Sequence, residues 1–224
     1  MIPIRDTVKS KSFPFVNFII IALNIMVFFG ESSLNQMQLT ELFYNFGVIP
    51  SHFSETLSGG NYVGAFIPLI TSVFLHGGWL HIISNMLFLW VFGDNIEDRT
   101  GHFKYLIFYL LAGAIGNLAQ IYANPASTVP IIGASGAVAG ILGAYYFSFP
   151  RSRILALVPI IFFFTLVEVR ASIFIIFWFV LQVFNGLFTL GAIGNPVAWW
   201  AHIGGFLGGL ILIRLFSKKR IAVM

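Results

Sequence analysis

The chain has 224 residues, of which 58% are hydrophobic and only 9% are charged. A soluble domain usually carries about 25% charged residues, so most of this surface must face lipid rather than water. The net charge of +4 comes from few and scattered basic residues, which excludes a nucleic-acid site. The absence of cysteine excludes disulfides, Cys-based metal sites and a thiol nucleophile.

Six apolar segments are long enough to be membrane spans, because a bilayer core needs about 20 apolar residues per helix, or fewer where neighbouring segments help. They cover residues 13–30, 79–92, 103–122, 131–149, 171–190 and 196–216. No repeat or low-complexity tail divides the chain. We therefore expect an all-α integral membrane protein with six transmembrane helices, forming a single domain over residues 1–224.

Two stretches fall outside these spans. Residues 31–78 form a long first loop, and a loop of this length in a compact protein is expected to be folded and functional. Its helix breakers are Pro50, Gly59, Gly60 and Pro68. Residues 154–167 are apolar but interrupted by Pro159, which favours an interfacial or re-entrant segment, with a seventh span as the alternative.

The basic residues predict the orientation, since Lys and Arg accumulate on the cytoplasmic side. With six spans, all 12 fall on one side: Arg5, Lys9, Lys11, Arg99, Lys104, Arg151, Arg153, Arg170, Arg214, Lys218, Lys219 and Arg220. A seventh span would split them between the two sides. We expect both termini in the cytoplasm, the first loop outside, and a location in the cell membrane.

In this topology three spans place polar side chains at a similar depth near the outer side. These are His81 and Asn85 in the second span, Ser135 in the fourth and His202 in the sixth. Ionisable residues inside spans indicate function by default. A neutral imidazole accepts the proton of a serine hydroxyl near pH 7, so Ser135 and His202 form a candidate dyad. No Asp or Glu occurs at that depth to act as a third member.

The oxyanion of an acyl-transfer intermediate needs preorganised donors. His81 and Asn85 lie four residues apart and therefore on one helix face; with the backbone N–H of Ser135 they are the candidate donors. Glycines allow close helix packing in lipid. They form a stripe at Gly136, Gly140 and Gly143 in the fourth span, and two GxxxG pairs, Gly204–Gly208 and Gly205–Gly209, in the sixth.

Each polar residue taken alone has a simpler interpretation. Ser135 alone would be a helix-packing residue, His202 an interhelical hydrogen-bonding residue, and His81 with Asn85 a polar clamp between helices. A metal site built from His76, His81 and His202 is a further alternative, although no carboxylate or cysteine joins them. The four polar residues together favour a nucleophile with its base.

Three motifs in the chain resemble the signatures of rhomboid intramembrane serine proteases, in the same order. They are His76-Gly77-Gly78-Trp79-Leu80-His81-Ile82-Ile83-Ser84-Asn85, Gly133-Ala134-Ser135-Gly136 and Ala201-His202-Ile203-Gly204-Gly205-Phe206. The resemblance implies a six-helix rhomboid fold, Ser135 as nucleophile, His202 as base, and His81 and Asn85 at the oxyanion hole. It also implies cleavage of transmembrane proteins near the outer face without a cofactor or metal.

The chain departs from its relatives at two positions. Ile67-Pro68 stand where many rhomboid proteases carry a Trp-Arg pair, and Ala139 stands where some carry an aromatic residue stacked on the histidine. The imidazole is therefore expected to be held by another group, or to be held less tightly. One rival interpretation is a catalytically inactive relative that binds membrane helices. The other is a transporter, which would need polar residues along the whole path rather than in the outer half alone.

Overall fold

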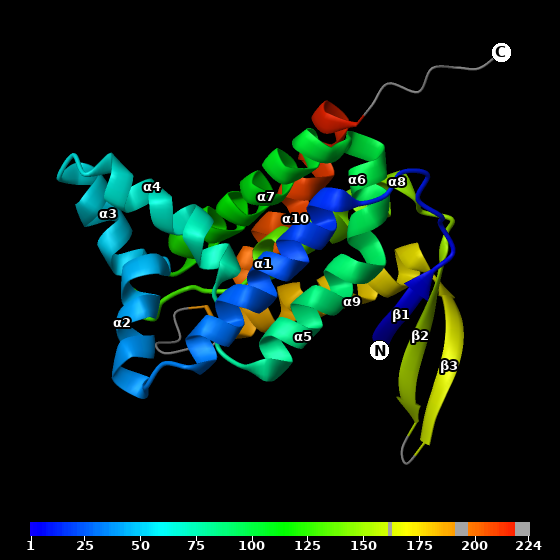
Figure 1. Cartoon of the computed structure of the whole chain (residues 1–224), viewed down its shortest axis with the longest axis horizontal. Coiled ribbons are helices and arrows are strands. Elements are labelled where there is room, and N and C mark those ends of the chain that lie inside the picture. Colours follow the sequence, from blue (N-terminus) through cyan, green and yellow to red (C-terminus); the bar gives the residue numbers. More distant parts are fainter. Residues whose placement is uncertain (161–162, 191–196, 218–224) are drawn as a thin grey trace.

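The computed structural model of the chain describes residues 1–160, 163–190 and 197–217 and is mostly helical (Figure 1). The first loop contains α2 (Gln36–Phe46), α3 (Pro50–Ser58), α4 (Tyr62–Thr71) and the 3-10 turn η1 (Ser72–Phe74). The remaining helices are α1 (Phe15–Ser32), α5 (Trp79–Phe88), the π-helical turn η2 (Leu89–Gly93), α6 (Asp94–Thr100), α7 (His102–Ala123), α8 (Ser135–Ser148), α9 (Ala171–Phe188) and α10 (Trp199–Phe216). The expected helical membrane fold with a structured first loop is confirmed.

A helix stands at each of the six predicted spans, but not all have the length of a span. Four helices, α1, α7, α9 and α10, are long and apolar enough to cross a membrane. A fifth candidate joins α4 and η1 to the continuous helix α5–η2–α6 across an 86° bend. That helix continues to Thr100, beyond the predicted end at residue 92. The start of the predicted sixth span, at residue 196, lies outside the described residues.

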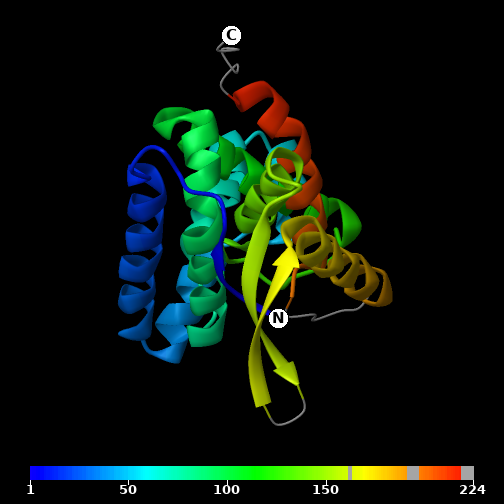
Figure 2. The same cartoon turned by 90° about the vertical axis from the view of Figure 1, so that its right-hand side faces the viewer.

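The short helix α8 occupies the centre of the bundle. It has only 14 residues, and every residue from Gly136 to Tyr145 is buried. α7 and α10 pack along it, while α1 and α9 stand on opposite sides of the molecule (Figure 2). A helix enclosed by protein in this way has little lipid-facing surface and does not need the full length of a lipid-exposed span. The predicted start at residue 131 is therefore early, and the helix begins at Ser135 itself.

The contact between α8 and α10 depends on glycine. A Cβ at Gly205 would overlap the carbonyl oxygen of Gly136, and one at Gly209 would overlap that of Gly140. On α8, a Cβ at Gly143 would likewise overlap the carbonyl oxygen of Phe206. The predicted close approach of the two glycine-containing helices is thus present, and it brings the first turn of α10 against the first turn of α8.

A three-stranded antiparallel sheet lies beside the helices and was not predicted from the sequence. Its strands are β1 (Ile2–Asp6), β2 (Arg153–Ile160) and β3 (Phe163–Arg170), in the order β1-β2-β3. β2 and β3 form the hairpin that projects from the bundle in Figure 1. The stretch 154–167, expected to be an interfacial or re-entrant segment, thus forms most of a β-hairpin, and its alternative of a seventh helical span is wrong. Pro159 lies near the hairpin turn, opposite Phe164, where a missing N–H is tolerated.

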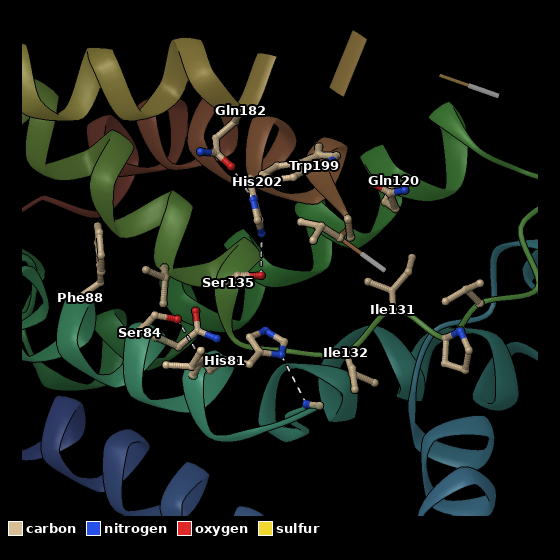
Figure 3. Close-up of a pocket in the computed structure, with 18 of the residues that line it drawn as sticks. His81, Ser84, Phe88, Gln120, Ile131, Ile132, Ser135, Gln182, Trp199 and His202 are labelled. Atoms are coloured by element: carbon tan, nitrogen blue, oxygen red, sulfur yellow. Dashed lines mark hydrogen bonds between the residues drawn. The ribbon is translucent and has the colours of Figure 1, made fainter. Parts of the chain in front are cut away.

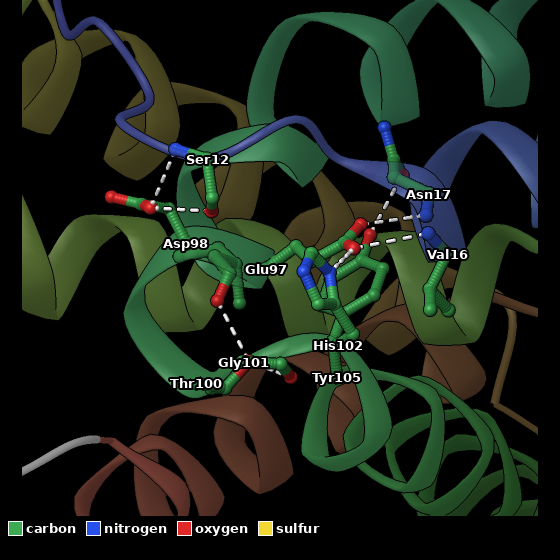
Figure 4. Close-up of polar contacts among 10 residues, drawn as sticks. Ser12, Val16, Asn17, Glu97, Asp98, Thr100, Gly101, His102 and Tyr105 are labelled. Carbon is green, nitrogen blue, oxygen red and sulfur yellow. Dashed lines mark hydrogen bonds and ion pairs between the residues drawn. The ribbon is translucent and has the colours of Figure 1, made fainter.

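A polar network joins the end of the bundle far from Ser135. Glu97 is fully buried, and its carboxylate accepts hydrogen bonds from the backbone N–H groups of Val16 (3.0 Å) and Asn17 (2.7 Å) (Figure 4). An anion at the first turn of α1 satisfies free N–H groups and opposes the positive end of the helix dipole. The Asn17 side chain donates to Leu89 O and accepts from Tyr105, which locks α1 to the η2 turn and to α7.

The amino-terminal strand is fastened at the same end. The Asp6 carboxylate accepts hydrogen bonds from the Tyr145 hydroxyl and from Asn95 Nδ2 (3.0 Å). The pKa of Asp6 is raised from 3.8 to about 6, mainly by burial and also by the nearby Asp94 carboxylate, while the Tyr145 hydrogen bond opposes the shift. β1 is therefore held to the helices by a carboxylate whose charge is costly to bury.

Candidate active site

Ser135 and His202 meet where α8 and α10 begin. The distance between Ser135 Oγ and His202 Nε2 is 2.8 Å, which is a hydrogen bond (Figure 3). The close packing of α8 on α10 sets this distance, because both residues stand in the first turn of their helices. The structure thus brings together the two residues that the sequence predicts as a dyad, from positions 67 residues apart.

The segment before Ser135 is fixed on both sides. Ile131 pairs with Val48 of the first loop through two backbone hydrogen bonds, and Gly133 N donates to Ser72 O of η1 at 2.9 Å. Gly133 has a φ of +117°, a region that only glycine enters without strain. The chain can therefore turn sharply into α8, and Ser135 is the first residue of a helix whose initial N–H groups have no intrahelical acceptor.

His81 lies against this turn. Gly77 N–H donates to His81 Nδ1 at 3.4 Å, so Nδ1 carries the lone pair and the proton of a neutral ring is on Nε2. A Cβ at Gly133 would overlap that Nε2 atom. Only glycine allows the imidazole to approach the backbone just before Ser135. An N–H donor from α5 is therefore placed beside the start of α8.

Asn85 is the second polar residue that α5 brings to the site. It is buried, and its Nδ2 atom has no hydrogen-bond partner among the described residues. An unsatisfied buried donor costs about 1–3 kcal/mol, so a site that keeps one is expected to use it when a ligand binds. Both predicted donors, His81 and Asn85, line the same cavity as Ser135 and His202.

This cavity has a volume of about 780 Å³. Its apolar walls come from α5, α8 and the segment before it, α9 and α10, and include Leu80, Phe88, Ile132, Val138 and Trp199. None of the described side chains that line it is an acid, a lysine or an arginine. The cavity is thus large enough for several side chains of an apolar segment, and its polar side chains come from elements that include α5, α7, α8, α9 and α10.

Two glutamines that the sequence analysis did not single out also belong to the site. Gln120 Oε1, from α7, accepts from the backbone N–H groups of Trp200 (3.0 Å) and Ala201 (3.3 Å), and so caps the start of α10. Gln182 Oε1, from α9, lies 2.9 Å from His202 Nδ1. A polar amide in an apolar span is a signal that draws attention to both, although it also marks amides with structural contacts, such as Asn117.

The structure shows which rings stand beside the His202 imidazole in place of an aromatic residue at position 139. Ala139 is buried in α8 and leaves the imidazole of His202 without an aromatic residue from that helix. Trp178 of α9 and Trp199 of α10 stand at its sides instead, with ring centroids 6.0 Å and 5.9 Å away. Helix α9 therefore contributes both the Trp178 ring and the Gln182 amide to the surroundings of His202.

His76 packs beside His81, with ring centroids 5.0 Å apart. Its backbone N–H donates to both carboxylate oxygens of Glu31 at the end of α1, each at 3.2 Å. This contact joins the turn before α5 to α1. Among the described residues no group of three or more His, Cys, Asp or Glu side chains is arranged to hold a metal ion.

The fold and the site define a class: a multi-pass helical membrane protein with a serine–histidine pair in a cavity between its helices. The family model of the rhomboid domain matches residues 63–219, which is more than half of the chain. The chain therefore belongs to the rhomboid family.

Several relatives carry protease names. The chain is 28% identical over 191 residues to "Putative rhomboid protease YdcA" of Bacillus subtilis, which covers 82% of this chain and 87% of that protein. It is 33% identical over 131 residues to "Rhomboid protease GluP" of the same organism, covering 58% of this chain and 24% of that protein. It is 34% identical over 102 residues to "Rhomboid protein 1, mitochondrial" of Saccharomyces cerevisiae, covering 44% and 30%. The chain thus spans less than a third of the latter two. The family and these relatives support an intramembrane protease.

Proposed function

We propose that this protein is a serine endopeptidase that cleaves transmembrane segments of other membrane proteins by a Ser135–His202 dyad. The observation that carries the proposal is the 2.8 Å hydrogen bond between Ser135 Oγ and His202 Nε2 inside a cavity between the helices. A hydroxyl bonded to an imidazole is the arrangement of an activated serine nucleophile. The protease names of the relatives favour the same function.

The reaction follows from the positions of the atoms. Ser135 Oγ attacks the scissile carbonyl carbon while its proton passes to His202 Nε2. When the tetrahedral intermediate collapses, the C–N bond breaks and the imidazolium gives that proton to the leaving amine. Water then attacks the acyl-enzyme with the same imidazole as base, which releases the carboxylic acid and restores Ser135. No cofactor or metal is required for these steps.

The negative oxygen of the tetrahedral intermediate needs donors. His81 Nε2–H, Asn85 Nδ2–H and the backbone N–H of Ser135 are the candidates, because all three belong to residues that line the cavity. One well-placed donor contributes about 3–4 kcal/mol to the stabilisation of such a transition state. The free Asn85 amide suits this role, since it gains a partner only when the oxyanion forms.

The orientation proposed from the basic residues fits the place of the site. Ser135, His202 and His81 all lie at the starts of their helices, while Arg99 lies at the far end of the α5–η2–α6 helix and Lys104 lies in the first turn of the following helix, α7. With basic residues in the cytoplasm, both termini are cytoplasmic and cleavage occurs toward the outer face of the cell membrane.

A cleavage assay tests the proposal. The purified protein is reconstituted in liposomes with a tagged single-span reporter protein, and the products are mapped by mass spectrometry. The Ser135→Ala and His202→Ala variants are expected to lose cleavage. Ser84→Ala is the matched control, because Ser84 lines the same cavity but donates to the carbonyl of His81 in its own helix. Equal cleavage by Ser135→Ala and wild type would refute the proposal, and binding of the reporter without cleavage would favour a helix-binding protein.

A further inference from the structure

Gln182 makes two hydrogen bonds that together fix the direction of its amide. It lies on α9 and is only 6% exposed. Its Nε2 lies 3.0 Å from the carbonyl oxygen of Trp178, one turn earlier, and its Oε1 lies 2.9 Å from His202 Nδ1 (Figure 3). The site thus contains a chain of contacts from the α9 backbone through Gln182 and His202 to Ser135.

The Trp178 carbonyl determines which atoms in this series of hydrogen bonds carry the protons. A carbonyl oxygen only accepts hydrogen bonds, so it requires the NH₂ group of the Gln182 amide. The amide oxygen then faces His202 and also only accepts, so His202 Nδ1 must carry the proton. In a neutral imidazole the lone pair is then on Nε2, the atom that accepts the Ser135 hydroxyl.

We propose that Gln182 is a positioning residue. Its uncharged amide stands beside the Ser135–His202 dyad and holds His202 in the one tautomer able to act as base. The proposal rests on the proposed function of Ser135 and His202. In the other tautomer Nε2 carries the proton and cannot accept that of Ser135. In Ser-His-Asp enzymes a carboxylate selects the tautomer; here a neutral amide does so in a cavity where an unpaired carboxylate would be costly.

The surroundings of His202 leave this role to Gln182. α5 contributes His81, α7 contributes Gln120 to the backbone at the start of α10, and α8 contributes Ser135. None of the described side chains lining the cavity is charged, so no acid replaces the amide. The two tryptophans restrict tilting of the imidazole, but they offer no acceptor to Nδ1. Gln182 is thus the acceptor that the described structure provides.

Two substitutions at this position separate hydrogen bonding from packing. Gln182→Met keeps the length and volume of the side chain but removes the acceptor. Gln182→Glu keeps an oxygen that accepts from Nδ1, whether or not the carboxyl is protonated. We expect Gln182→Met to lower kcat for the reconstituted reporter about 10- to 100-fold, with KM changed less than twofold, because tautomer selection affects the chemical step. Gln182→Glu is expected to keep at least a third of wild-type kcat.

The controls distinguish a failure of the Gln182 proposal from a failure of the proposed function. Asn185→Leu removes an amide one turn further along α9, from a residue that does not line the cavity, and is expected to leave kcat unchanged. Wild-type kcat in Gln182→Met would overturn the proposal, and so would equal losses in the Met and Glu variants, since the retained acceptor of the Glu variant would then make no difference. If the wild type itself does not cleave, or Ser135→Ala still cleaves, the proposed function fails instead.

A spectroscopic measurement tests the tautomer without activity, and applies even if Gln182→Met does not fold. Wild-type protein with ¹⁵N-labelled histidine rings is measured by NMR, and the His202 signals are identified by their loss in His202→Gln. The proposal predicts a protonated Nδ1 and an unprotonated Nε2 at neutral pH. A protonated Nε2 beside an unprotonated Nδ1 would overturn it.

Discussion

The packing of α10 on α8 predicts that Gly205→Ala disables the site without touching a polar residue. The added Cβ would lie 2.9 Å from the carbonyl carbon of Gly136, the residue after Ser135, and would overlap its oxygen. Carbon atoms in contact are normally about 3.5–4.0 Å apart. Because the obstacle is backbone rather than a flexible side chain, the two helices must separate by about 1 Å at this level.

This separation acts directly on the dyad. The bond between Ser135 Oγ and His202 Nε2 would lengthen from 2.8 Å by about the same amount, beyond hydrogen-bonding distance. A misplacement of about 1 Å costs about 100-fold in rate, and overpacking of this kind costs about 1–3 kcal/mol of stability. We therefore expect folded Gly205→Ala to cleave at about 1% of the wild-type rate, with a lowered unfolding temperature.

The assay compares initial cleavage rates and thermal unfolding with those of two other glycine variants. Gly208→Ala, one turn along the same helix, places its Cβ 2.9 Å from Ile115 Cγ2, a side chain that is able to move. Gly30→Ala meets nothing within 4 Å. Both are expected to keep most of the activity. A wild-type rate in Gly205→Ala would refute the inference that glycine packing holds the dyad together.

Three further predictions concern other parts of the molecule. Asp6→Asn should change the pH dependence of stability: because the pKa of Asp6 is raised in the folded state to about 6, the wild type loses stability as the pH rises from about 4 to 6. The variant should not, so its unfolding temperature in a pH series should exceed that of the wild type only above about pH 6. Glu97→Ala leaves the N–H groups of Val16 and Asn17 unpaired and should lower the unfolding free energy by about 2–3 kcal/mol, measured by denaturant titration; an unchanged midpoint would contradict this. Asn85→Ala should lower kcat about 100- to 1,000-fold with little change in unfolding temperature, since its Nδ2 atom has no hydrogen-bond partner among the described residues; unchanged steady-state kinetics would remove Asn85 from the oxyanion hole.

The helices were predictable because lipid imposes a simple rule. Apolar runs of sufficient length and few charges mark them, and each predicted span contains a helix. Their lengths were less predictable. The α5–η2–α6 helix continues through polar residues such as Glu97 because these find buried partners in α1. α8 is short because protein rather than lipid surrounds it, which no local pattern reveals.

The sheet could not be predicted from local pattern, since its first strand pairs with residues about 150 positions away. Ile2 faces Leu157, and Asp6 faces Ile154. An apolar run broken by Pro159 is compatible with a strand, a re-entrant segment or a helix. Only the partner strands decide among them.

Within the candidate site, the sequence was enough to single out the proposed dyad and oxyanion donors, because Ser135, His202, His81 and Asn85 are polar residues expected at one depth in three apolar spans. The contribution of α9 did not emerge in the same way. Gln182 has no motif around it, and its meaning depends on the rotation of α9 relative to α10, which places it 2.9 Å from His202 Nδ1. The alanine at position 139 indicated only that the imidazole is held by another group or held less tightly, and did not identify that group.

The most direct test of the account is labelling of the detergent-purified protein with a fluorophosphonate probe, which reacts covalently with activated serines, followed by mass spectrometry of the modified peptide. The account predicts modification of wild-type protein at Ser135, with loss of labelling in both Ser135→Ala and His202→Ala. The double variant should be hardly worse than either single one, because the two residues act as a unit. An unlabelled wild-type protein with a cooperative thermal unfolding transition, or labelling that survives in Ser135→Ala, would contradict it.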